Sequence, residues 1–117
     1  MMNIRALSVL ACLIAAPAAM AADHDYPTHE RVMYAIQCIN RHGGAQELLY
    51  KCSCAIDRMA QQYSYDEFVD MQTAANALTM TGERGGELRD NGQVRAGAKL
   101  YRQSESVALQ ACGIAPK

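Results

Sequence analysis

Two cysteines stand one residue apart in the stretch KCSCAID, as Cys52 and Cys54. A pair at this spacing could bind a soft metal ion, take part in thiol–disulfide exchange, or supply one sulfur to each of two disulfides. If both residues lie on a helix, their side chains point about 200° apart. They then cannot share one metal ion, and each sulfur needs a distant partner of its own.

The two other cysteines outside the N-terminal leader are Cys38 and Cys112. An even number of cysteines in a small exported chain is most simply explained by structural disulfides. Cys38 lies beside the turn RHGG, and Cys52 is the member of the Cys-x-Cys pair that is closer to that end. In an up-down bundle Cys112 finishes at the opposite end, toward Cys54. This topology favours the pairs Cys38–Cys52 and Cys54–Cys112 among the three possible connectivities. A soft-metal or redox site remains the alternative to two disulfides.

The N-terminus of the mature chain offers a second candidate site. Cleavage after Ala21 would leave a chain that begins Ala22-Asp23-His24. The free amine, two deprotonated amides and the imidazole of His24 would form the square-planar nitrogen set that Cu(II) prefers. A flexible polar tail is the alternative interpretation of these residues. The sequence predicts no other cofactor.

Two glycine-rich turns, RHGG and TGERGG, form a third candidate, a surface for a partner. The first and third connections of an up-down bundle lie at the same end, so we expect these turns to be neighbours. Loops on a rigid scaffold often carry recognition. The residues of this predicted anion- or protein-binding surface are Arg41, His42, Gly43, Gly44, Glu83 and Arg84. The alternative is that the glycines only end helices and that an arginine pairs with Glu83.

All three candidates depend on a predicted helical scaffold. Ser64 and Glu67 form a capping box that starts one helix. Other helices are expected to begin near Thr28, near Gln46 and between residues 87 and 93, and TGERGG is expected to end the third. Apolar residues recur at helical spacing in each segment, for example Val32, Met33, Ile36 and Ile39 in the first. The prediction is an all-α fold, a small up-down bundle of about four helices stapled by two disulfides.

The first 21 residues have the pattern of a cleaved secretory signal peptide. Arg5 precedes the apolar run of residues 6–16, and Ala19-Met20-Ala21 offers a cleavage site. The run is shorter than the roughly 20 residues of a membrane-spanning helix. We therefore expect one helical domain of residues 22–117, with residues 22–27 as a flexible tail. The predicted location is the periplasm or the outside of the cell, with no membrane anchor after cleavage.

The charge balance and the missing motifs narrow the function. Without Arg5, the 11 basic residues become 10 against 12 acidic residues, which does not favour a nucleic-acid partner. The chain has no P-loop, no dinucleotide fingerprint, no Gly-x-Ser-x-Gly and no His-Glu-x-x-His sequence. The sequence therefore predicts a protein that binds a partner and is not an enzyme.

The string KCSCAIDRMAQQYSYDEFVDMQTA, followed by TGERGG and RDN, resembles a group of small exported proteins of proteobacteria. Some of these are loosely associated with periplasmic alcohol oxidation by quinoprotein dehydrogenases. The resemblance spans about residues 30–112 and implies an accessory role, without assigning ligand or catalytic residues. We expect a secreted accessory protein that supports a periplasmic enzyme system through a protein partner. The alternatives are a copper-binding protein that uses His24, and an inhibitor or immunity-type protein.

Overall fold

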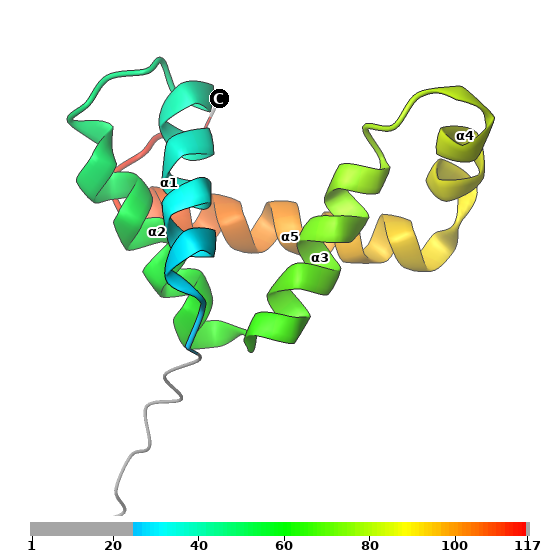
Figure 1. Ribbon diagram of the computed structural model, residues 1–117, viewed down its shortest axis with the longest axis horizontal. Helices are drawn as coiled ribbons and strands as arrows, with labels where there is room; N and C mark the ends of the chain where they lie inside the picture. The colour runs from blue at the N-terminus through cyan, green and yellow to red at the C-terminus, as the bar shows by residue number, and fades with distance from the viewer. Residues whose placement is uncertain (1–24, 117) are drawn as a thin grey trace, which may run out of the picture.

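Every regular element that the structure describes is an α-helix (Figure 1). The computed structural model describes residues 25–116 of the 117-residue chain. The helices within this range are α1 (Thr28–Arg41), α2 (Leu48–Gln62), α3 (Tyr65–Ala77), α4 (Gly82–Asp90) and α5 (Gly92–Ala111). The all-α prediction is confirmed, with five helices within the described range in place of about four.

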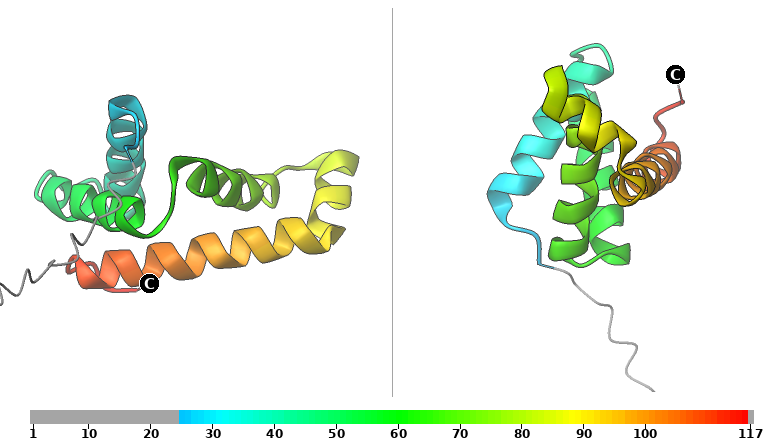
Figure 2. Two further views of the ribbon diagram at one scale, coloured as in Figure 1. Left: turned by 90° about the horizontal axis from the view of Figure 1, so that it is seen from below. Right: turned by 90° about the vertical axis from the view of Figure 1, so that its right-hand side faces the viewer.

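The helices are arranged as two arms that share one crossing helix. Helices α1 and α2 form an antiparallel hairpin, and α3 rises beside it as the second arm (Figure 1). Helix α5 packs against both α2 and α3, and the short α4 lies at its far end (Figures 1 and 2). The expected up-down bundle would place the last helix alongside the others. Instead, the 20-residue α5 runs across them, because its length lets it contact both arms.

Local signals in the sequence fix the starts of α3 and α5. The Ser64 hydroxyl accepts a hydrogen bond from the Glu67 amide at 3.2 Å, and the Glu67 carboxylate accepts one from the Ser64 amide at 2.8 Å. The predicted capping box is therefore confirmed. Asn91 begins α5, since its side-chain oxygen accepts from the amides of Gln93 and Val94. Helix α1 begins at Thr28, as expected, and Pro27 occupies its N-cap position.

The segment TGERGG forms most of the first turns of α4 instead of only ending α3. Gly85 is buried within this helix, and a Cβ atom there would lie 2.2 Å from the carbonyl oxygen of Met80. The side chain of Arg89 also donates to that oxygen. Gly85 therefore allows α4 to pack closely against the preceding turn. The expectation that the glycines of TGERGG only end a helix is wrong for this residue.

The buried face of α1 is not the one that the apolar pattern predicts. Val32, Met33 and Ile36 are 50%, 50% and 48% exposed, whereas Tyr34 and Cys38 are buried. Both sets recur at helical spacing, so periodicity alone does not choose between them. The disulfide at Cys38 turns its own side of α1 toward α2. The apolar residues of α2 and α5 recur at the expected helical spacing, and those that are buried are Cys52, Ala55, Ile56, Met59, Ala98, Tyr101 and Ala108.

Tyr26 anchors the chain immediately before α1. Its side chain is 2% exposed, and its hydroxyl donates to the Tyr63 carbonyl oxygen at 3.0 Å in the α2–α3 connection. Its ring lies 4.9 Å from that of Phe68 and 5.5 Å from that of Tyr65, centroid to centroid. The expectation of a flexible tail up to residue 27 is therefore wrong for Tyr26, which holds the bases of both arms together.

Two disulfides connect the helices in the pairing that the sequence favoured. Cys38 on α1 is joined to Cys52 on α2, with 5.8 Å between their Cα atoms. Cys54 on α2 is joined to Cys112 at the end of α5, with 5.9 Å between their Cα atoms. The two adjacent cysteines of α2 thus reach different helices, as helical divergence requires. Disulfides of this kind indicate an oxidising, extracellular compartment.

Candidate functional site

A cleft lined mainly by residues with polar side-chain groups opens between the two arms, and α5 forms its floor. We call it the inter-arm cleft, and its volume is about 480 Å³. The gap between α1 and α3 widens toward the ends of these helices (Figure 1). Three elements supply its lining residues, which are Gln37, Asn40 and Arg41 from the first arm, Gln72, Ala75, Asn76 and Thr79 from the second, and Tyr101, Arg102 and Glu105 from α5.

The arms contact each other near their bases. The Glu30 carboxylate on α1 accepts hydrogen bonds from the Tyr65 hydroxyl at 3.5 Å and from the Gln72 amide at 3.4 Å. Tyr26 fills the space below this contact and packs against Phe68. The disulfide Cys38–Cys52 holds α1 against α2 within the first arm. These contacts at the bases of the arms close one end of the cleft and set the distance between its two walls.

Carboxamide side chains dominate the walls of the inter-arm cleft. Gln37 and Asn40 line one wall, and Gln72 and Asn76 line the other. A carboxamide both donates and accepts hydrogen bonds, so it can pair with the N–H and C=O groups of a peptide backbone. Gln37, Asn40 and Asn76 are exposed to solvent. The lining thus offers polar groups to a ligand from both sides.

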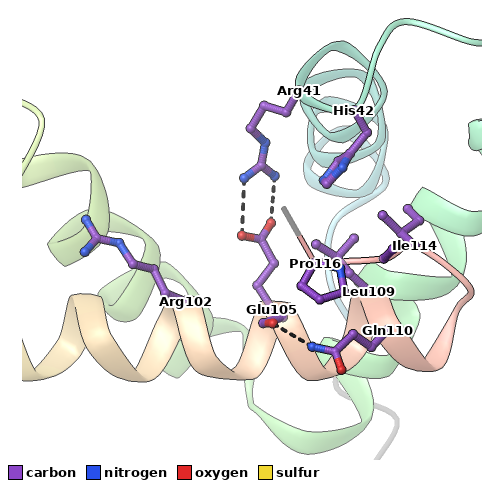
Figure 3. Close-up of a pocket in the computed structure, with 10 residues that line it drawn as sticks. Arg41, His42, Arg102, Glu105, Leu109, Gln110, Ile114 and Pro116 are labelled. Carbon is purple, nitrogen blue, oxygen red and sulfur yellow. Dashed lines mark hydrogen bonds and ion pairs between the residues drawn. The ribbon is translucent and has the colours of Figure 1, made fainter.

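An ion pair joins the C-terminal end of α1 to α5 beside the cleft. The Arg41 guanidinium donates to both carboxylate oxygens of Glu105, at 2.6 and 3.2 Å (Figure 3). The Glu105 side chain is 9% exposed and that of Arg41 is 48% exposed. The hydrogen bond to Glu105 raises the pKa of Arg41 above its usual value. A two-point contact with a buried carboxylate fixes the end of α1 against α5.

Two buried phenols lie close to the same carboxylate. Burial, and to a smaller extent the negative charge of Glu105, raise the pKa values of Tyr34 and Tyr101 above the ordinary value for tyrosine. Both hydroxyls therefore stay protonated at neutral pH, and the local charge is that of Arg41 and Glu105. The ion pair with Glu105 therefore holds Arg41 in place at the edge of the cleft.

A second cleft lies on the other side of the ion pair, between the end of α1 and the C-terminal segment. Figure 3 shows Arg41 and His42 on one side of it, with Leu109, Ile114 and Pro116 on the other. Its volume is also about 480 Å³. The buried Leu109 and Ile114 give this cleft a more apolar character than the inter-arm cleft. Arg41, Arg102 and Glu105 line both clefts.

The structure separates the two turns that the sequence placed side by side. Arg41 and His42 lie at the clefts, next to the exposed turn of Gly43 and Gly44. Glu83 and Arg84 lie on α4, at the far end of α5 (Figures 1 and 2), and α1 and α4 do not pack together. The two arms diverge and α4 extends the second one, so the predicted joint surface is wrong. Arg41 pairs with Glu105, and among residues 25–116 no arginine forms an ion pair with Glu83.

Sequence reasoning missed the carboxamide walls and Glu105. Gln72 and Asn76 are four residues apart on α3, which places them on one helical face. Glu105 follows Ala98 and Tyr101 along the buried stripe of α5. A carboxylate at a core position is rarely buried without a partner. That position was the available signal for an ion pair in this part of the fold.

The signal segment 1–21 and the predicted copper ligands Ala22, Asp23 and His24 lie outside the described residues. Within residues 25–116 no three histidine, cysteine or acidic side chains gather in a way that could hold a metal ion. None of the helices in that range is both long enough and apolar enough to cross a membrane.

Comparison of the chain with protein-family models, curated protein sequences and solved structures finds no match.

Proposed function

We propose that this chain is a non-enzymatic accessory protein of the periplasm, and that it holds a protein partner in the inter-arm cleft. The observation that carries the proposal is the cleft itself, a polar recess between two arms with carboxamides on both walls. Such groups match the hydrogen-bonding pattern of a polypeptide backbone. The partner is proposed to belong to a periplasmic enzyme system, as the resemblance to exported proteobacterial proteins implies.

The construction of the scaffold supports this proposal. Binding loses less free energy to ordering when the binding surface is held in shape beforehand. Here Cys38–Cys52 fixes α1 on α2, Cys54–Cys112 fixes α2 on α5, and Tyr26 fixes the base of the cleft. The ion pair between Arg41 and Glu105 adds a fixed, charged group at the edge of the cleft. These features suit reversible recognition on a rigid surface.

Affinity capture from a periplasmic extract of the source cells tests the proposal. The bait is the oxidised chain of residues 22–117, and Asn76→Trp would fill the inter-arm cleft from its second wall. Gln61→Trp adds the same bulk at an exposed position of α2 that does not line the cleft. We expect a protein that the unmodified chain and Gln61→Trp retain and that Asn76→Trp loses. Equal retention by both variants would refute binding in the cleft.

A further inference from the structure

Three cations lie along one side of α5. Arg95, Lys99 and Arg102 are spaced four and three residues apart, which puts them on one face of the helix. All three are exposed to solvent. Arg102 also lines the inter-arm cleft. We call Arg95, Lys99 and Arg102 the basic face of α5.

None of these three cations forms an ion pair within the described residues, and the nearby Glu105 pairs with Arg41. The ion pairs found within residues 25–116 are Arg31–Asp57 and Arg41–Glu105, so no carboxylate there lies within ion-pair distance of the basic face. The whole chain carries a formal charge of −1. A concentration of positive charge on one side of such a chain attracts anionic groups and repels cationic ones.

The spacing of the basic face fits an extended peptide. With a helical rise of about 1.5 Å per residue, Arg95 and Lys99 are about 6 Å apart along the axis, and Lys99 and Arg102 about 4.5 Å. Alternate side chains of an extended peptide are about 6.6 Å apart on the same side. Acidic residues at alternate positions of a peptide can therefore each reach one cation of α5.

We propose that the partner presents an extended acidic segment, which lies along the basic face of α5 and enters the inter-arm cleft beside Arg102. This inference rests on the proposed function, because it names the chemistry of the partner bound at that site. The carboxylates of the segment pair with Arg95, Lys99 and Arg102, and its backbone meets the carboxamides of the cleft.

The test uses the oxidised chain of residues 22–117 and a short capped peptide with glutamate at alternating positions. Its counterpart with glutamine at the same positions controls for charge, and succinate controls for a free dicarboxylate. Binding is followed by NMR shifts of the protein amides. We expect the glutamate peptide to shift the amides of residues 95–105 and of the cleft walls, with affinity that falls as salt is added. The glutamine peptide and succinate should cause much smaller shifts.

Two pairs of charge variants distinguish binding at the basic face from non-specific attraction between the protein and an acidic peptide. Lys99→Gln with Arg102→Gln should weaken binding of the glutamate peptide by about fourfold to 25-fold, because each lost pair should cost about twofold to fivefold in affinity. Arg58→Gln with Arg84→Gln removes the same charge from exposed positions elsewhere and should have little effect. Equal losses in both pairs, no binding of the glutamate peptide, or preferential binding to anionic vesicles would overturn the inference. If a protein is still captured in the inter-arm cleft after such a result, the proposed function stands and only the acidic chemistry fails.

Discussion

Truncation of Tyr26 is predicted to destabilise the protein as strongly as the loss of a core aromatic residue. The side chain is 2% exposed and packs against Phe68, although it precedes the first helix. Replacing a buried aromatic side chain with alanine costs about 3–5 kcal/mol. Tyr26→Phe keeps the ring and removes only the hydroxyl, whose shortest hydrogen bond is to the Tyr63 carbonyl oxygen, so it should cost about 1 kcal/mol.

Denaturant unfolding of the oxidised chain, followed by far-UV circular dichroism, measures both changes. Tyr50→Ala is the matched control, because Tyr50 is 83% exposed on α2 and its truncation should alter the free energy of unfolding by less than about 0.5 kcal/mol. A Tyr26→Ala variant as stable as the Tyr50→Ala variant would show that the segment before α1 is not anchored. The account of how the arms are fixed at their bases would then be wrong.

The remaining predictions concern the disulfides, the exposed face of α1 and the buried phenols. Replacing both Cys54 and Cys112 with alanine should lower the free energy of unfolding by about 4 kcal/mol, because this disulfide closes a loop between residues that are 58 positions apart in the sequence. A loss below about 1 kcal/mol in denaturant unfolding would contradict this prediction. Ile56→Ala should lower the free energy of unfolding by about 2–5 kcal/mol and Ile36→Ala by less than about 1 kcal/mol, because of these two residues only Ile56 is buried. If Ile36→Ala destabilised the protein as much as Ile56→Ala, α1 would bury the face that the sequence predicted. Burial raises the pKa of Tyr101 above the ordinary 10.0. Above pH 10 the unfolded chain therefore binds fewer protons than the folded chain. The free energy of unfolding then falls by up to about 1.4 kcal/mol per pH unit for this phenol. Tyr101→Phe should make that alkaline decline shallower, and an unchanged slope in unfolding experiments across this pH range would count against it.

The disulfide pairing was predictable because it follows from local geometry and chain direction. Helical periodicity sends Cys52 and Cys54 to different sides of α2, and the antiparallel turn places Cys38 next to Cys52. The start of α3 was predictable for a similar reason, since the capping box involves only Ser64 and Glu67. These features depend on residues that are near in sequence or on the direction of successive helices.

The inter-arm cleft was not predictable, because it depends on how helices cross. Periodicity identifies an apolar face of α5 but does not say that this face contacts two diverging arms. In α1, two neighbouring stripes are apolar, and the tertiary contact of Tyr34 and Cys38 decides which is buried. In α4, Gly85 has a packing role that depends on the nearby Met80 carbonyl. Each of these outcomes is set by contacts outside the local segment.

Site-specific photocrosslinking in the source cells tests the central claim most directly. A photoreactive side chain at Asn76 would lie on a wall of the inter-arm cleft, and one at Gln61 would lie on an exposed part of α2 outside it. Binding in the cleft predicts a covalent adduct with an exported protein from position 76 and none from position 61. No adduct from position 76, or the same adduct from both positions, would contradict the claim that the cleft holds a protein partner.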